Sequence, residues 1–211
     1  MRAEDGQLRT PLLLACESAA FDSAGMLLDS GASLAARDKS DMTPLHWLAF
    51  HGSKPMLLKA LAKSAEMDAV NYAMQTPLWF AITKGHLPSA LALVDAGARV
   101  DVVDDSKRTM MHVAMQYGGE ADESADSLPL VQSLLKRKAD VNAVDREKRT
   151  ALHWAAGKNA TPCVAALIAA GADVNAKDWS AHTPLHWAMP MDAVESTAAL
   201  LKVGVMVMVY G

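Results

Sequence analysis

Short alanine-rich apolar runs recur along the chain, and each is set off by polar residues and by a proline or glycine. The run at residues 45–49 follows Thr43 and Pro44. A threonine hydroxyl can cap the start of a helix, and proline suits the first helical position because no N–H is needed there. A break such as Gly52 follows, and a second apolar run such as residues 164–168 comes after the corresponding break. The pattern predicts two short helices per segment, each pair joined to the next by a loop.

The segments repeat at a fixed spacing. The threonines that open them are separated by 33, 33, 33, 41 and 33 residues: Thr10, Thr43, Thr76, Thr109, Thr150 and Thr183. A second series follows the second helices with the same spacing. Its copies are Gly31-Ala32-Ser33-Leu34, Gly97-Ala98-Arg99-Val100, Lys138-Ala139-Asp140-Val141 and Gly171-Ala172-Asp173-Val174, with a degenerate copy at Ser64. Two motifs therefore give the same period, which indicates a repeat architecture.

The period of 33 residues and the Thr-Pro-Leu-His motif resemble the ankyrin repeat family. The resemblance implies an all-α fold with short β-hairpin loops, in which six helix-turn-helix units and the start of a seventh hairpin stack into a solenoid. We expect one domain over residues 1–211, with units at 5–37, 38–70, 71–103, 104–144, 145–177 and 178–203 and an unfinished hairpin at 204–211.

The fourth unit is longer than the others, and we place its excess in an acidic loop at residues 118–127. A surface insertion is cheap in free energy because the cost of closing a loop rises slowly with its length. The alternative is an acidic contact or a phosphorylation site at Ser124 or Ser127.

The hairpin tips depart from the family, which normally places glycine two residues before the threonine. The residues at this position are Leu8, Asp41, Met74, Lys107, Lys148 and Ala181. A left-handed backbone at a residue other than glycine costs about 1 kcal/mol. We therefore expect the turns to be relaxed, or tolerated by a well-buried stack; the alternative is that long tip side chains gain reach for contacts.

Composition and charge narrow the classes of function. The chain has 211 residues, 51% of them apolar, and a net charge of −4, which argues for a folded protein and against general nucleic-acid binding. Its start lacks a secretory pattern, and no apolar run approaches the roughly 20 residues of a membrane span. Cys16 and Cys163 each lie in an apolar run, which suits buried thiols in a reducing compartment. We expect a cytoplasmic protein, with the nucleus as the alternative.

Four histidines are candidates for metal binding or acid–base chemistry: His46, His112, His153 and His186. With one per unit, neighbours lie about 8–10 Å apart, whereas zinc ligands must all lie about 2.1 Å from one ion. The resemblance implies instead that each histidine hydrogen-bonds the threonine and nearby backbone. No nucleotide-binding, hydrolase or metalloprotease motif occurs. We expect no catalytic residue, no metal, no cofactor and no enzyme activity.

The resemblance also implies a modification. Asn142 and Asn175 each lie eight residues after a leucine, and such asparagines in this family can be hydroxylated. We favour the alternative, in which each asparagine forms a turn.

The residues that the repeat leaves variable are the candidates for binding. In the family they lie on the hairpin tips and on the inner face of the first helix, which together form a concave strip. The candidates are Lys39, Met42, Phe50, His51, Tyr72, Gln75, Lys84, Arg108, Gln116, Tyr117, Arg146, Arg149, Lys158, Trp179 and His182. Aromatic residues, methionine and arginine of this kind are typical of protein interfaces.

We therefore expect a non-catalytic, monomeric module that binds a protein or peptide. The alternative is a regulatory or targeting block of a larger multidomain protein such as an enzyme or a channel. Six basic residues in the fourth and fifth units, opposed by four acidic ones, favour an acidic peptide, unless they form only a solvated rim. The basic residues are Lys107, Arg108, Arg146, Lys148, Arg149 and Lys158, and the acidic ones are Asp104, Asp105, Asp145 and Glu147.

Overall fold

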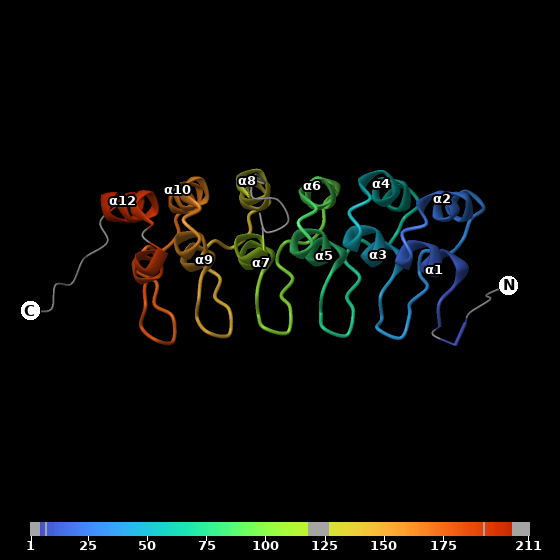
Figure 1. Ribbon diagram of the computed structural model, residues 1–211, viewed down its shortest axis with the longest axis horizontal. Coiled ribbons are helices and arrows are strands. Elements are labelled where there is room, and N and C mark those ends of the chain that lie inside the picture. The colour runs from blue at the N-terminus through green and yellow to red at the C-terminus, as the bar shows by residue number, and fades with distance from the viewer. Residues whose placement is uncertain (1–4, 7, 118–126, 192, 204–211) are drawn as a thin grey trace, which may run out of the picture.

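The computed structural model describes residues 5–6, 8–117, 127–191 and 193–203, and it leaves the side chain of Met191 out. Over these residues the chain forms twelve α-helices that pair in chain order along one row (Figure 1). The first helices of the pairs are α1 (Pro11–Glu17), α3 (Pro44–Phe50), α5 (Pro77–Thr83), α7 (Met110–Tyr117), α9 (Ala151–Gly157) and α11 (Pro184–Ala188). The second helices are α2 (Phe21–Asp29), α4 (Lys54–Ala62), α6 (Leu87–Ala96), α8 (Leu128–Lys136), α10 (Thr161–Ala169) and α12 (Val194–Lys202). A 3₁₀ turn, η1 (Met189–Met191), follows α11.

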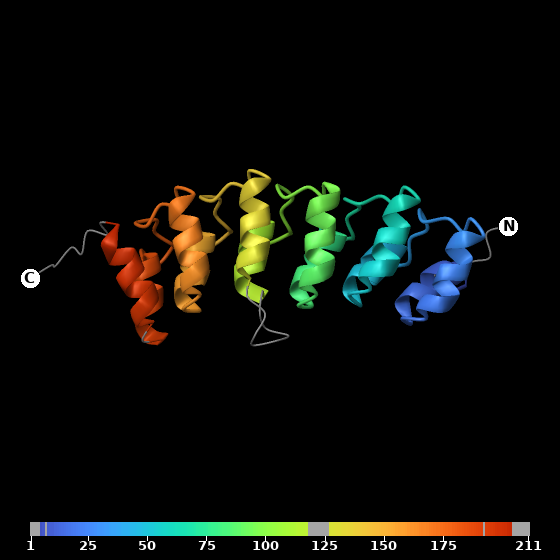
Figure 2. The ribbon, with the colours of Figure 1, turned by 90° about the horizontal axis from the view of Figure 1, so that it is seen from above.

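The pairs stack side by side in two layers. The first helices lie in one layer and the second helices in the other, and the loops that connect successive pairs project from the same side of the stack (Figure 1). Seen from above, the second helices lie next to one another in chain order (Figure 2). The predicted all-α repeat fold is confirmed. Within the described ranges the loops form no β-strand, and their β-structure is limited to an isolated antiparallel bridge between Val103 and Thr109.

Each first helix starts where the threonine predicts. The hydroxyl of Thr43 accepts the N–H of His46, and Pro44 occupies the first turn. Thr10 and Thr76 cap α1 and α5 in the same way. The capping satisfies an N–H that the helix itself leaves unpaired.

The core runs through the whole row. The residue two places after the threonine is at most 1% exposed in the first five units, where it is Leu12, Leu45, Leu78, Met111 and Leu152. Because each of these side chains packs between neighbouring helix pairs, no unit has a core of its own. Cys16 and Cys163 belong to the same core, and no disulfide joins them. No helix of the described chain is long and apolar enough to span a membrane.

The tips keep the left-handed turn, so the expectation of relaxed turns is wrong. The φ angles at the position two residues before the threonine are +62° at Leu8, +62° at Asp41, +58° at Met74, +59° at Lys107, +57° at Lys148 and +60° at Ala181. Hydrogen bonds hold this geometry. In the second hairpin the Asp38 carboxylate accepts the N–H groups of Ser40 and Met42 at 2.8 and 3.0 Å, and the Asp38 N–H donates to the Met42 carbonyl.

Replacing Ala181 with glycine should therefore stabilise the protein. The substitution removes one methyl group from a residue at φ +60°, and we expect a gain of about 0.5–1 kcal/mol in the free energy of unfolding. The matched control is Ala165→Gly in the exposed face of α10, which should lose about 1 kcal/mol because its backbone is helical. Urea unfolding of both variants measures the difference, and a loss of stability in both would contradict a strained tip.

Candidate functional site

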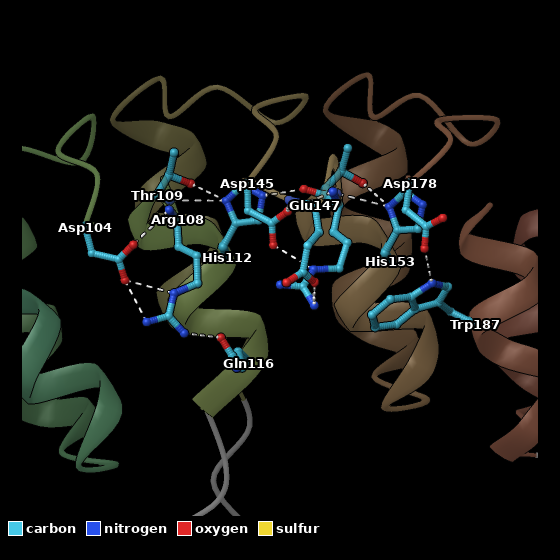
Figure 3. A network of polar contacts seen from close by, with 12 residues as sticks. Asp104, Arg108, Thr109, His112, Gln116, Asp145, Glu147, His153, Asp178 and Trp187 are labelled. Carbon is cyan, nitrogen blue, oxygen red and sulfur yellow. Dashed lines mark hydrogen bonds and ion pairs between the residues drawn. The ribbon is translucent and has the colours of Figure 1, made fainter. Parts of the chain in front are cut away.

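Three buried histidines each join their own unit to the next one. The Thr109 N–H donates to Nδ1 of His112 at 3.2 Å, and Nε2 of His112 lies 2.9 Å from the Arg149 carbonyl in the following hairpin (Figure 3). Since Nδ1 accepts a backbone N–H, the ring is the neutral tautomer whose Nε2–H donates. His46 and His153 bind the carbonyls of Gln75 and His182 in the same way, at 3.1 Å each.

These rings are therefore structural groups with both nitrogens engaged. Burial lowers the pKa of His46 to about 4, and it also lowers the pKa of His112 and of His153. Among the residues with described positions, no group of three or more His, Cys, Asp or Glu side chains is placed to hold a metal ion.

A buried aspartate closes the hairpin that precedes Thr109, and another closes the hairpin that precedes Thr150. Oδ1 of Asp104 accepts the N–H groups of Ser106 and Arg108 at 2.9 and 3.0 Å, and Oδ1 of Asp145 does the same for Glu147 and Arg149. Both aspartates are only 4% exposed. Both aspartates were predicted only as acidic residues that oppose the basic ones, so their role in closing the hairpins was missed. The signal was available, because an aspartate stands five residues before the threonine in every unit but the third, which has Asn71.

Arg108 is held inside its own unit. Its guanidinium lies 2.7 Å from Oδ2 of Asp104 and donates to Oε1 of Gln116 at 2.6 Å (Figure 3). It also donates to the hydroxyl oxygen of Tyr117 at 3.2 Å. The structure thus brings three predicted binding residues together, but they bind one another. The Arg108 side chain is only 14% exposed.

Arg149 is also neutralised. Its Nε lies 2.7 Å from Oδ2 of Asp145, its Nη1 pairs with Glu147, and its guanidinium lies 4.6 Å from the centre of the Trp154 ring. The predicted basic patch is therefore weaker than its residue count suggests. Lys158 is exposed and its amine donates to the Gln116 carbonyl, while Lys107, Arg146 and Lys148 are exposed on the tips.

Trp154 differs from the equivalent tryptophans of other units. The indole N–H of Trp47 donates to Asp38 at 3.1 Å, and that of Trp187 donates to Asp178 at 3.0 Å. Within the described part of the chain the buried indole N–H of Trp154 has no acceptor. Arg149 occupies the carboxylate oxygen of Asp145 that the tryptophan uses in the other two hairpins.

One candidate for binding is wrong. Met42 is only 4% exposed and packs in the core, where its sulfur meets the side-chain amide of Asn71 at 3.5 Å. The residue before the threonine carries a backbone N–H and a carbonyl that both bond within the hairpin. From this position the apolar Met42 side chain packs in the core, whereas Arg108 and Arg149, at the equivalent positions, pair with Asp104 and Asp145.

In the N-terminal half the remaining candidates form one small cluster and several separate positions. Phe50 and His51 are half-buried neighbours, and the Lys84 amine lies 4.5 Å from the centre of the Phe50 ring. His51 is bonded to the carbonyl of Glu17 at 2.8 Å. The other N-terminal candidates are exposed or half-buried tip residues that lie apart from this cluster: Lys39, Tyr72 and Gln75.

A hollow of about 370 Å³ lies between the fifth hairpin, which precedes Thr150, and the sixth hairpin, which precedes Thr183. Its walls bring together three predicted residues from two units, Arg149, Trp179 and His182. Trp179 is 70% exposed. The other lining residues are Glu147, Asp178, Ser180 and Trp187. Trp187 was not among the residues predicted to bind, although it lies on this wall.

The predicted modification sites lie on the loops that follow the second helices. The Asn142 side chain donates to the Gly171 carbonyl at 3.0 Å and accepts the Asp173 N–H at 2.8 Å, so it bridges two units. Asn175 is exposed and donates its N–H to Asp173. Asn142 therefore joins two units, and at Asn175 the Asp173 carboxylate supplies the local acceptor. Turn formation by the asparagine side chains and their hydroxylation both stay predictions. The acidic loop at 118–126, Ser124 included, and the unfinished hairpin at 204–211 lie outside the described residues.

Paired short helices, capping threonines, histidines that bind the next hairpin and projecting loops define a helical repeat solenoid. A family model described as ankyrin repeats in three copies matches residues 12–104, 45–128 and 121–209. The chain belongs to the ankyrin repeat family, whose repeats are protein-interaction modules.

Three curated relatives illustrate the range of proteins that contain such repeats. The chain is 33% identical over 156 residues to the B-cell lymphoma 3 protein homolog of Mus musculus, covering 71% of this chain and 33% of that protein. It is 32% identical over 156 residues to inversin of Canis lupus familiaris, covering 72% and 14%. It is 26% identical over 154 residues to the transient receptor potential cation channel subfamily A member 1 of Drosophila melanogaster, covering 71% and 13%. The matched region thus spans one third or less of each relative.

Removing the Asp104 carboxylate tests whether it is a structural clamp. Asp104→Ala leaves two hairpin N–H groups and the Arg108 guanidinium without their acceptor, so we expect a loss of about 2–4 kcal/mol in the free energy of unfolding. The neighbouring exposed Asp105→Ala is the matched control and should change stability by about 0.5 kcal/mol or less. Equal effects in urea unfolding would show that the carboxylate does not close the hairpin.

The histidines predict a specific pH dependence. The pKa of His46 falls from the ordinary 6.5 to about 4 on folding. Above pH 6.5 the histidine is therefore neutral in both the folded and the unfolded chain, and it lowers the free energy of unfolding by nothing there. As the pH falls from 6.5 to 4, His46 binds a proton in the unfolded chain but not in the folded chain, so the free energy of unfolding decreases. His46 alone should cost about 2 kcal/mol at pH 5, with losses of the same sign from His112 and His153. Urea unfolding at pH 7.5 and pH 5 measures the loss, and equal stability at both would contradict it.

Proposed function

We propose that this interaction module binds an extended segment of another protein across its fifth and sixth hairpins. The observation that carries the proposal is the hollow of about 370 Å³ with the 70% exposed Trp179 on its wall. An aromatic side chain beside a concave space is the arrangement that most often supplies binding energy at protein interfaces.

The two hairpins are held in register before any partner arrives. The N–H of Trp179 donates to the Glu147 carbonyl at 3.0 Å, and the N–H of Arg146 donates to the Ser106 carbonyl at 3.1 Å. The hairpins of the fourth, fifth and sixth units are thus joined through their backbones. A wall that is already ordered loses little conformational entropy on binding, which favours affinity.

The charges at this site favour a partner with an apolar anchor and acidic flanks. Arg146 and Lys148 are exposed on the fifth hairpin, while Glu147 and Asp178 line the hollow itself. The Glu147 charge is paired with Arg149. Acidic residues on the partner would therefore meet the exposed tip cations, and the apolar anchor would enter beside Trp179 and Trp187.

The binding is non-catalytic in this proposal. The second candidate is a regulatory or targeting block within a larger protein, and it is favoured by the relatives, in which the matched region covers only 13–33% of the length. We place the protein in the cytoplasm, with the nucleus as the alternative, because buried thiols such as Cys16 and Cys163 suit a reducing compartment.

Substituting Trp179 tests the proposed surface. Affinity capture from a cytosolic extract with Trp179→Ala should lose a partner that the parent chain retains, and titration of that purified partner should show a loss of about 30-fold or more in affinity. Tyr72→Ala is the matched control, because Tyr72 is a 78% exposed aromatic residue on a distant hairpin tip. Both variants should unfold at the same temperature as the parent.

The two substitutions separate the competing surfaces. Loss of the partner with Tyr72→Ala and retention with Trp179→Ala would move the site to the N-terminal hairpins. Retention with both would exclude an aromatic anchor on either tip.

A further inference from the structure

The side chain of Asn142 ties the loop after α8 to the loop after α10. Its amide group donates to the Gly171 carbonyl at 3.0 Å, and its carbonyl accepts the Asp173 N–H at 2.8 Å. A backbone acceptor and a backbone donor, two residues apart on one loop, are thus satisfied together by a single carboxamide. Because a carboxamide is both a donor and an acceptor, it is the side-chain group that matches such a pair.

The loops after α2 and α4 lack this bridge. Counting back eight residues from the next threonine gives Asn142 in the fourth unit and Ala35 in the first. A methyl group can neither donate nor accept a hydrogen bond. The pair that it faces on the second loop consists of the Ser64 carbonyl and the Glu66 N–H, and neither has a hydrogen-bond partner among the described residues.

The other units place a polar residue at the position of Ala35. Asp68 accepts the Arg99 N–H from the following loop at 2.9 Å, and Asp101 pairs with the Arg99 guanidinium at 3.0 Å. The five residues at this position are Ala35, Asp68, Asp101, Asn142 and Asn175. The first loop is therefore the one whose side chain has no means of binding its neighbour.

A hollow of about 390 Å³ lies where the bridge is missing. The first unit contributes Ala35 and the fully buried Leu28 to its lining, and the second unit contributes Ser64 and Glu66. The helices before these loops, α2 and α4, are neighbours in the second layer (Figure 2). Ligand pockets measure about 300–1,000 Å³, so the hollow has room for a carboxamide and for part of the chain that bears it.

The charges around the hollow favour a neutral ligand. Lys63 and Glu66 bring one charge of each sign, and the Glu66 carboxylate is already paired with Arg37 at 3.0 Å. A ligand carboxylate could accept the Glu66 N–H, but its second oxygen would face the Ser64 carbonyl with no proton between them. An ammonium group would satisfy the carbonyl and leave the N–H without an acceptor.

We infer that this hollow binds the side-chain carboxamide of an asparagine from a partner protein. The carboxamide oxygen accepts the Glu66 N–H, and its NH₂ group donates to the Ser64 carbonyl. The partner thus supplies between the first and second units the bridge that Asn142 supplies between the fourth and fifth. The source is a protein because repeats of this family are protein-interaction modules. The hollow is separate from the surface around Trp179.

Placing the carboxamide in the chain itself tests the geometry. In Ala35→Asn the new side chain should form the bridge and slow hydrogen exchange of the Glu66 amide about fivefold, the ratio that one net hydrogen bond gives. Ala35→Leu is the matched control, because leucine has the size of asparagine but no polar group, and it should leave that exchange unchanged. Exchange followed by NMR measures both. No slowing in Ala35→Asn, or equal slowing in Ala35→Leu, overturns the inference.

Titration of the parent chain with N-acetyl-L-asparagine methylamide tests binding directly. The probe should shift the Glu66 amide resonance in a saturable way at roughly millimolar concentration. N-acetyl-L-aspartate methylamide, which replaces the carboxamide with a carboxylate, should not. In Ala35→Asn the asparagine probe should lose its effect, because the variant's own side chain fills the site.

The remaining outcomes decide against the inference. Equal shifts with both probes would remove the selectivity for a carboxamide, and no shift with either would mean that water satisfies the pair. Propionamide, a carboxamide without a peptide backbone, should bind about tenfold more weakly; equal binding would overturn the assignment to a protein segment. The titration of the parent decides the matter should Ala35→Asn fail to fold, and none of these results bears on partner binding at Trp179.

Discussion

The two nitrogens of a buried imidazole connect the local and the repeating levels of this structure. In three units Nδ1 accepts the threonine N–H at the start of a helix, while Nε2 donates to the carbonyl that precedes the next threonine. The bond at Nδ1 requires the neutral ring, because a protonated Nδ1 has no lone pair to accept the N–H, and burial favours the neutral ring by lowering the pKa. The same side chain therefore fixes where a helix begins and where the following hairpin lies.

The third unit shows that the constraint is the connection and not the histidine itself. Trp79 occupies the histidine position there, and its indole N–H donates to Oδ2 of Asp104 in the next hairpin at 3.3 Å. The donor and the acceptor thus both differ from those of the histidine units, but the bond still reaches the following hairpin. The position tolerates the substitution because an N–H still crosses from one unit to the next.

The sequence predicted those features that recur with the period. The helix starts at Thr43 and Thr76 and the core positions depend on a residue and its near neighbours, which the units repeat. The histidine bonds were an implication of the family resemblance, because their carbonyl acceptors lie in the following hairpin. The left-handed tips were misjudged because their cost was weighed without Asp38 and its equivalents, whose hydrogen bonds hold the turn. The burial of Met42 and the pairing of Arg108 depend on side-chain direction and on three-dimensional neighbours, which a period does not specify.

The indole N–H of Trp154, which has no acceptor among the described residues, changes how readily the fifth hairpin can release Arg149. Asp145 stands nine residues before Trp154, the separation at which Asp38 and Asp178 accept an indole N–H. If a ligand carboxylate drew Arg149 away, Trp154 would be in place to donate to Asp145, and the buried carboxylate would exchange one donor for another instead of losing its partner. Arg108 has no such substitute, since Trp79 already donates to Asp104. Of the two guanidinium groups, the one beside the hollow is therefore the one that the protein can release at low energetic cost.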